Sequence, residues 1–452
     1  MVLADAAIMD VNYVDIEVNG GQKHTATVLF YSYENNSYIS LRDVAFALKD
    51  TDKAFDFYVT NGSIRINTQK ACTGVKPENA WPETFTASHT VNLKTNELKV
   101  DGEDRKYSTI ISSDANGQYD AFFSLLDLSM ILDIHMAFED DVIKADTEVA
   151  FDITPEMLEE EGFFEGVNAA LVGNATTGEI WYGYNSDLVY PIASTTKIMT
   201  YLLVMEAVSE GKFSLEDSAT VSARAELLSR GGDSVVGLTQ GQQIPVKDLL
   251  YGMLIASSNE SALVLAETVG GSEEKFADMM NEKASQIGML DSKFYNSNGL
   301  PDYSEHFSSS KRQNYMTAQD MFVLCAYVLR AYPQITQITS TKNITPAYFG
   351  REIKNTNSLL HNIEQVTGLK TGTTNKAGYC LITSLKEDDN DLVVVMFGAD
   401  NSTDRIRVSE VLSRYALRRF RYGATSEEEI HTAIDDADDI VRAVIRYAKS
   451  KS

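Results

Sequence analysis

The sequence predicts an α+β protein with more than one domain, and three patterns along the chain support this prediction. The first third contains an internal repeat of short strands and a helix, and an acidic connector follows it. The rest of the chain begins with a strand hairpin, continues through a helical middle and returns to strands. This order predicts one sheet assembled from both ends of the larger domain, with a helical subdomain inserted between them.

Composition limits the classes of function. The chain has 452 residues, is 44% hydrophobic and carries a net charge of −26. Such a negative field repels nucleic acid and anionic membrane surfaces, so we expect neither as a partner. The three cysteines lie far apart and the six histidines show no ligand spacing. We therefore expect no disulfide framework, no metal site and no other cofactor.

The repeat defines an N-terminal module that we place at residues 1–148. "EVNG" at 17–20 recurs as "KVDG" at 99–102, and "SLRDVAFALK" at 40–49 recurs without gaps as "SLLDLSMILD" at 124–133. Apolar residues in the longer pair recur every three to four positions, which predicts an amphipathic helix in each copy. We predict two small α+β units paired side by side, acting as a spacer or docking module without chemistry.

The remaining boundaries follow from composition. Pro155 and an acidic run predict a linker at 149–166. We place the larger domain at 167–424; it begins with the hairpin "NAALVGNATTGEIWYGYN" and returns to a buried strand, "DLVVVMFGA". We predict a C-terminal helix at residues 425–452. This helix is too acidic to bind anionic lipid, so we expect it to pack on the protein's own surface.

Three short motifs carry the chemistry. Ser194 lies three residues before Lys197, at the start of the helical stretch "STTKIMTYLLVMEAV". This S-x-x-K pattern occurs three more times in the chain, so alone it decides nothing. Ser257 and Asn259 belong to the only S-x-N, and Lys370 begins the only K-T-G. The ordered triple is typical of serine acyltransferases that attack D-amino-acid peptides and β-lactams.

The residue types fit that chemistry. A serine hydroxyl needs a partner that takes its proton, and Lys197 lies on the same helix face as Ser194. A lysine acts as a base only where its ammonium form is disfavoured, which burial and the second cation Lys370 both promote. A helix N-terminus at Ser194 also supplies backbone N–H groups where an oxyanion would form. We predict that Ser194 is a nucleophile and Lys197 its base.

With these motifs, residues 166–422 resemble the D-alanyl-D-alanine carboxypeptidases, low-molecular-mass penicillin-binding proteins of bacterial wall synthesis. The stretches "GLTQGQQIPVKDLLYGMLIASSNESALVLAE" and "GLKTGTTNKAGYCL" also match, while the family's S-G-N-D-A is here S-S-N-E-S-A. The resemblance implies a β-lactamase/DD-peptidase-like fold, an antiparallel sheet with helices plus an all-helical lobe. The N-terminal repeat resembles stalk modules similar to the N-terminal domain of copper amine oxidases, without a copper-ligand cluster.

The resemblance also implies roles for the motif residues. Ser194 would be acylated, with Lys197 as general base. Ser257 would relay the proton to the leaving D-alanine, and Asn259 would hold Lys197 and the substrate amide. Lys370 would supply positive potential.

Substrate-binding residues are implied on the edge strand and beyond it. Thr371, Gly372 and Thr373 would line the strand where substrate docks, and the N–H groups of Ser194 and Thr373 would form the oxyanion hole. The family places a carboxylate-binding arginine before its final helix. Counting back from "ALRRF" selects Arg405, with Arg407 as the alternative. A plain surface arginine paired with Asp404 or Glu410 is the non-functional interpretation.

The expected activity is removal of the terminal D-alanine from peptidoglycan stem peptides through an acyl-enzyme, with β-lactam antibiotics as covalent inhibitors. D,D-endopeptidase action on cross-links would use the same residues. A β-lactamase is less favoured, because Glu305 has the wrong surroundings for a deacylating glutamate. A non-catalytic wall-binding protein is disfavoured by the intact motifs.

The location follows from that activity. We expect a secreted or cell-surface protein with possible wall docking through the N-terminal module. No signal peptide is present as written, and "VLADAA" after Met1 is either the tail of a removed one or a disordered terminus.

Overall fold

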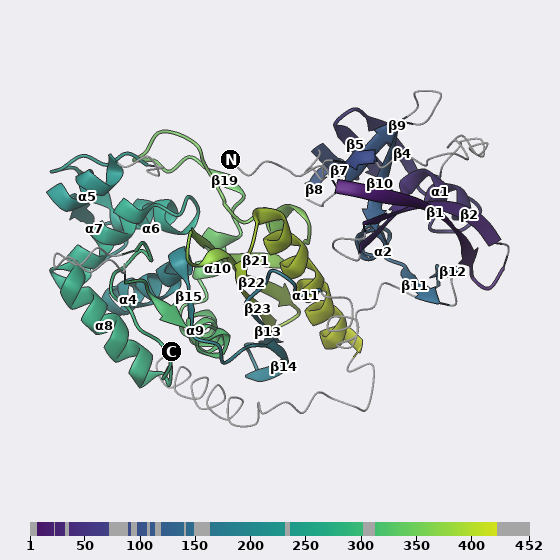
Figure 1. Ribbon diagram of the computed structural model, residues 1–452. Coiled ribbons are helices and arrows are strands. Elements are labelled where there is room, and N and C mark those ends of the chain that lie inside the picture. Colours follow the sequence, from purple (N-terminus) through teal and green to yellow (C-terminus); the bar gives the residue numbers. More distant parts are fainter. Residues whose placement is uncertain are drawn as a thin grey trace. The chain divides into compact units, whose positions relative to one another are not determined.

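The computed structural model divides into two compact units, residues 1–153 and 154–452 (Figure 1). It describes residues 7–21, 23–31, 36–71, 89–91, 97–105, 109–113, 119–139, 142–148, 163–230, 236–301 and 312–422. The predicted helix at 425–452, most of the predicted linker, Glu305 and Cys72 lie outside these residues, and the predicted domain boundaries stay a prediction. Within the described part of the chain, no helix combines the length and apolar character needed to span a membrane.

In the N-terminal unit the two repeat copies exchange strands. The first strand of each copy pairs in parallel with the last strand of the other copy. Thus β1 (Ala7–Val18) pairs with β12 (Val142–Asp146), and β7 (Glu97–Val100) pairs with β5 (Ser63–Asn67). The prediction of two units lying side by side is wrong in this respect, because the copies interlock. Exchange gives partners to strand edges that a single copy would leave open.

Equivalent details recur in both copies. The predicted helices are present as α1 (Leu41–Ala47) and α2 (Leu125–Leu132). Asn19 and Asp101, which begin the two equivalent turns, both have positive φ, as the residues after them do. Each also donates its backbone N–H across the exchanged pair, Asn19 to Ala145 O at 2.9 Å and Asp101 to Ile66 O at 2.8 Å. These matched bonds support the repeat read from the sequence.

The second unit contains a five-stranded antiparallel sheet in the order β14-β13-β23-β22-β21. The strands are β13 (Ala169–Asn174), β14 (Glu179–Tyr184), β21 (Val366–Thr374), β22 (Gly378–Glu387) and β23 (Asn390–Ala399). The hairpin that opens the unit pairs with β23 from the other end, which confirms a sheet assembled from both ends. β21, which carries the K-T-G motif, lies at one edge.

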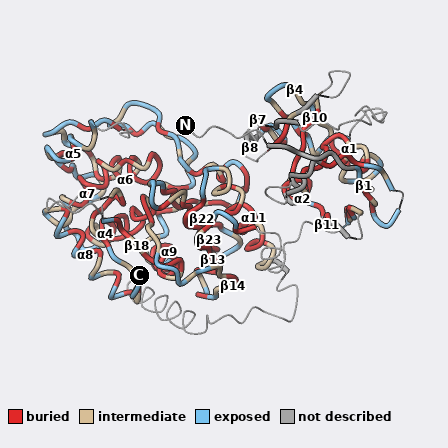
Figure 2. The backbone as a smooth tube through the Cα atoms, in the orientation of Figure 1, coloured by how far each residue is buried: buried red, intermediate tan, exposed pale blue. Residues whose placement is uncertain are grey.

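Helices cover both faces of this sheet. On one face, the ring of Phe322 from α9 (Ala318–Ala331) occupies the space that a Cβ at Gly173 would need, 2.7 Å away. On the other, Tyr415 of α11 (Ser402–Tyr422) contacts Tyr182, the cross-strand partner of Val172. Successive strand residues point to opposite faces, so α9 and α11 enclose the sheet. The central strands β22 and β23 are buried along most of their length (Figure 2).

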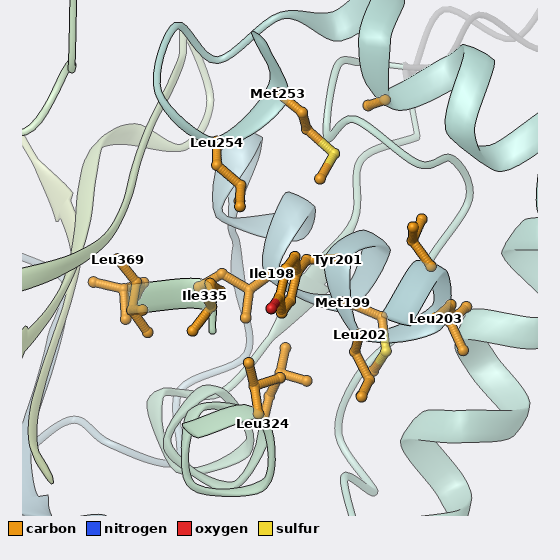
Figure 3. Packing of buried hydrophobic residues seen from close by; sticks show 14 of the residues in the cluster. Ile198, Met199, Tyr201, Leu202, Leu203, Met253, Leu254, Leu324, Ile335 and Leu369 are labelled. Carbon is orange, nitrogen blue, oxygen red and sulfur yellow. The ribbon is translucent and has the colours of Figure 1, made fainter. Parts of the chain in front are cut away.

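A helical lobe is inserted between β14 and β21. Its helices include α4 (Lys197–Ser209), α5 (Ala223–Ser229), α6 (Val246–Leu254), α7 (Asn259–Gly270) and α8 (Glu273–Gln286). Helix α4 is apolar on nearly every side, as expected for a helix inside a core. Figure 3 shows Ile198 of α4 among Leu254 of α6, Leu324 of α9, Ile335 of α10 (Ile335–Thr339) and Leu369 of β21. This cluster fixes the helix whose first residue is Lys197.

Residues at the end of the predicted linker belong to the packed unit. Phe164 stacks on Tyr184 with ring centroids 4.4 Å apart, and on Tyr182 at 5.7 Å. The backbone N–H of Asp400 donates to Gly166 O at 2.9 Å, just before α11 begins. The chain is therefore anchored to the sheet and to the start of α11 before its first strand.

We predict that Phe164→Ala lowers the free energy of unfolding of this unit by about 3–5 kcal/mol, because it removes a buried ring and leaves a cavity. Urea denaturation followed by circular dichroism measures the loss. The control is Leu290→Ala, whose side chain is 75% exposed. Comparable losses in the two variants would contradict the anchoring role.

Candidate active site

Ser194 lies in a 3₁₀ turn, η1 (Ala193–Thr196), and the α-helix begins only at Lys197. The sequence placed Ser194 inside the start of the helix, which is wrong by one turn. In 3₁₀ geometry residues three apart lie directly over one another. The side chains of Ser194 and Lys197 therefore still meet, with Lys197 Nζ 2.8 Å from Ser194 Oγ.

Three groups surround the Lys197 amine. Nζ donates to Asn259 Oδ1 at 2.8 Å and to the backbone oxygen of Asn298 at 2.9 Å, and its third contact is Ser194 Oγ. The oxygens of Asn259 and Asn298 can only accept hydrogen bonds, so they occupy two of the N–H groups of the amine. A neutral amine then has its lone pair directed at the Ser194 hydroxyl, while an ammonium donates to all three groups. The surroundings thus suit the amine before and after it takes a proton.

Burial and charge favour the neutral form of this lysine. Lys197 has no exposed surface, and burial followed by the charge of Lys370 lowers its pKa well below the ordinary value, against an opposing effect of Glu260. Burial and then the nearby Arg405 lower the pKa of Lys370 to about 7. The ammonium of Lys197 is disfavoured for the two reasons that would make a lysine a base.

The S-x-N motif occupies the loop between α6 and α7. Ser258 caps α7 by accepting the N–H of Ser261 at 3.0 Å, which makes Asn259 the first helical residue. From that position its side chain reaches Lys197. Ser257 is half-buried and has a φ of 61°, a backbone conformation uncommon for a residue other than glycine. Such conformations concentrate at functional sites.

The edge strand β21 passes directly against the nucleophile turn. A Cβ at Gly372 would lie 3.0 Å from both Ile192 O and Ser194 N, so any larger residue would force the turn and the strand to move apart slightly. Lys370 is buried and donates to Thr371 O at 3.0 Å. Thr371 is also buried, whereas Thr373 is exposed beyond Gly372. The strand thereby brings all four K-T-G-T residues beside Ser194.

Of the two candidate arginines, Arg405 contacts β21. Its Nη1 donates to Thr373 Oγ1 at 3.3 Å, and its guanidinium lies 5.4 Å from the ring centroid of Tyr379. Its Nε is buried and has no hydrogen-bond acceptor among the described residues. Arg407 instead lies over the ring of Phe163, and Glu410 pairs with Arg414.

The sequence did not reveal the contact between Lys197 and the carbonyl of Asn298. A backbone oxygen leaves no mark in residue identity, so no residue type in the sequence pointed to this contact. The one local signal is Gly299, whose φ is +86° and whose Cβ would lie 1.9 Å from Ala193 O. This loop is pressed against the nucleophile turn and requires glycine there.

A sequence profile of D-alanyl-D-alanine carboxypeptidases matches residues 166–401, slightly more than half of the chain. The chain belongs to this family. As a D-alanyl-D-alanine carboxypeptidase family member it is a serine hydrolase, and its β-lactamase/DD-peptidase-like fold class agrees with the resemblance read from the motifs.

Three relatives each match between half and two thirds of this chain. The D-alanyl-D-alanine carboxypeptidase DacF of Bacillus subtilis is 33% identical over 64% of this chain and 69% of its own length. DacC of Escherichia coli is 36% identical, but the match covers only 56% of that protein. A D-alanyl-D-alanine endopeptidase of Pseudomonas aeruginosa is 33% identical over 50% of this chain and 70% of its own length.

A solved structure supports the same fold. Penicillin-binding protein D2 from Listeria monocytogenes, in its ampicillin-bound form, aligns with a TM-score of 0.50 and 30% identity. The alignment covers 98% of that protein and 56% of this carboxypeptidase family member.

The buried lysines predict a pH dependence of stability. In unfolded chain a lysine holds its proton up to about pH 10.5, whereas folded Lys370 loses it near pH 7. The unfolded state therefore binds more protons between these values, and the free energy of unfolding rises with pH, by up to about 1.4 kcal/mol per pH unit for each such lysine. We expect Lys370→Met to reduce this slope between pH 7 and 8.5.

Denaturant unfolding at several pH values measures the slope. Lys275→Met, at an exposed lysine of α8, is the matched control and should leave it unchanged. An unaltered slope in Lys370→Met would show that this lysine keeps its proton in the folded protein.

Proposed function

We propose that this chain is a serine-type D-Ala-D-Ala carboxypeptidase that removes the terminal D-alanine of peptidoglycan stem peptides. One observation carries the proposal: the amine of Lys197 is buried with two acceptors and the hydroxyl of Ser194 at 2.8–2.9 Å. A nucleophile with a base of this kind suits acyl transfer. Membership of the carboxypeptidase family supplies the substrate class.

In the proposed acylation, Ser194 Oγ attacks the carbonyl of the terminal peptide bond while its proton moves to Lys197 Nζ. The N–H groups of Ser194 and Thr373 hold the oxyanion. Collapse of the tetrahedral intermediate breaks the C–N bond, and Ser257 relays a proton to the departing amine of D-alanine. Water then hydrolyses the ester on Ser194. Asn259 keeps Lys197 in place and binds the substrate amide.

Positive charge at the edge of the site suits an anionic substrate. Lys370 contributes potential next to the nucleophile turn, and Arg405 is placed to bind the terminal carboxylate beside Thr373. The free N–H donors of a guanidinium match a carboxylate in geometry and charge. Thr371 and Gly372 complete the strand along which the peptide would lie.

β-Lactams are proposed as covalent inhibitors of the same site. Attack of Ser194 on the lactam carbonyl opens the ring and leaves an ester whose leaving group stays attached. The ampicillin-bound relative from Listeria monocytogenes supports this proposal.

Endopeptidase action on D,D-cross-links is the second candidate, favoured by the relative from Pseudomonas aeruginosa that bears that name. It would use the same catalytic residues and differ in the room beyond the scissile bond. A wall substrate further implies an extracytoplasmic location. We propose wall or surface docking for the N-terminal unit, which contains none of the proposed catalytic residues.

Purified muropeptides test the proposed function. We expect the wild-type chain to release D-alanine from uncross-linked pentapeptides and to leave D,D-cross-links mostly intact. Ser194→Ala should release none and should form no penicillin adduct in intact-protein mass spectrometry, because no other hydroxyl faces Lys197 Nζ among the described residues. An adduct on that variant would refute the assignment of the nucleophile. Preferential cleavage of cross-links would replace carboxypeptidase by endopeptidase.

Arg405→Ala should lower kcat/KM for a D-Ala-D-Ala peptide tens-fold or more, a loss of about 2 kcal/mol for one charge-assisted pair. Acylation by penicillin should suffer less, since Thr371 and Thr373 can also hold its carboxylate. Arg407→Ala, two residues along the same helix, is the matched control and should retain peptide hydrolysis. Equal losses for peptide and penicillin in Arg405→Ala would indicate general disruption of the site. A loss confined to Arg407→Ala would assign binding of the terminal carboxylate to Arg407 instead.

A further inference from the structure

A buried carboxylate outside the three motifs holds the loop next to Lys197. Glu273 is the first residue of α8 and is only 4% exposed. Its Oε1 accepts the backbone N–H of Ser297 at 3.2 Å and the Ser297 hydroxyl at 2.9 Å. Its Oε2 pairs with Arg224 at 2.7 Å. Glu273 thus connects helix α8 to the loop that precedes Gly299.

The same loop residue is held from the opposite side. Thr200, one turn along α4 from Lys197, donates its hydroxyl to Ser297 O at 2.6 Å. The next carbonyl in the chain, that of Asn298, accepts the N–H of Lys197 at 2.9 Å. The direction of the Asn298 carbonyl therefore depends in part on how Ser297 is fixed by Glu273 and Thr200, alongside the Gly299 N–H of the same peptide, which donates to Asn296 Oδ1 at 2.8 Å.

Removal of the carboxylate would disturb this arrangement. The N–H and hydroxyl of Ser297 are fully buried, and each would lose its acceptor. Buried donors without acceptors are costly, so the loop would shift to find new partners. A shift of Ser297 would turn Asn298 as well, and with it the Asn298–Gly299 peptide whose oxygen faces Lys197.

We propose that Glu273 is a positioning residue for the catalytic amine: through Ser297 it directs the Asn298 carbonyl at Lys197 Nζ, and so directs the amine's lone pair at Ser194. The inference rests on the proposed role of Lys197 as base. Glu273 would act on the site indirectly, because it contacts Ser297 and not the nucleophile.

The proposal predicts a particular change in the pH profile. The charged groups that face Lys197 are Lys370 on β21 and Glu260 on α7, and neither changes when Glu273 is replaced. A carbonyl acceptor stabilises an ammonium more than a neutral amine, so misplacing it lowers the pKa of Lys197 further. The acid limb of acylation then moves to lower pH, while the plateau rate falls because the lone pair is misdirected.

The test uses the full chain and benzylpenicillin, with acylation rates measured by intact-protein mass spectrometry from pH 5 to 9. Glu273→Ala should lower the plateau about tenfold or more and move the acid limb to lower pH. Glu273→Gln keeps an acceptor for Ser297 and should recover most of the rate. Glu274→Gln is the matched control: that side chain is 71% exposed and pairs with the same Arg224, without contacting Ser297.

Circular dichroism at the assay temperature separates loss of fold from loss of rate. A folded Glu273→Ala with the wild-type rate and profile overturns the inference, and so does an equal loss in Glu274→Gln. If Glu273→Ala does not fold, Ser297→Ala decides, because an unchanged rate there also overturns it. If penicillin does not acylate the wild-type chain, the proposed function itself is overturned. If it acylates the wild type and Glu273→Ala at the same rate and with the same pH profile, only this inference is overturned.

Discussion

The burial of one lysine amine is the constraint on which the rest of this domain depends. Removing an ammonium from water is costly, and the fold compensates by giving Lys197 Nζ three partners at 2.8–2.9 Å. The partners come from segments far apart in sequence: the nucleophile turn, the first residue of α7 and the loop after α8. Helix α4 can carry this residue because its other side chains fill an apolar core (Figure 3). The packing that stabilises the domain therefore also determines the protonation state of the site.

A second consequence is that basic side chains are gathered where burial disfavours their charged forms. Lys197 and Lys370 are both buried, and Arg405 lies close enough to lower the pKa of Lys370. In a chain with a net charge of −26 this local excess is not a general surface property. It opposes folding at neutral pH and favours an anionic ligand, so stability is reduced at the place where binding requires charge.

The sequence predicted the elements and motifs better than their connections. Hydrophobic periodicity and unique motifs located the sheet, the helical lobe and the residues that meet at Lys197. The start of α4 was wrong by one turn, because a single turn is too short for apolar spacing to distinguish a 3₁₀ turn from the beginning of an α-helix. The repeat was visible, but its strand exchange was not, since similarity between two copies does not reveal which copy supplies a strand's partner. Glu273 resembled an ordinary acidic residue in a helix's first turn. The carbonyl of Asn298 had no sequence signature at all.

The residues proposed for the chemistry and the arginine proposed for substrate selection lie on different elements of this domain. The groups around Lys197 come from η1, α4, α7 and the loop at Asn298, all belonging to the inserted lobe or its junctions with the sheet. Arg405 lies on α11, a helix that packs on the opposite side of the sheet from α9. Arg407, on the same helix, lies over the ring of Phe163. If Arg405 and Lys197 have their proposed roles, a change near the start of α11 would alter recognition of the terminal carboxylate without moving the base. Because cross-links lack a free carboxylate at that position, the balance between carboxypeptidase and endopeptidase action would be determined at the junction of β21 and α11, and the acylating groups would remain common to both.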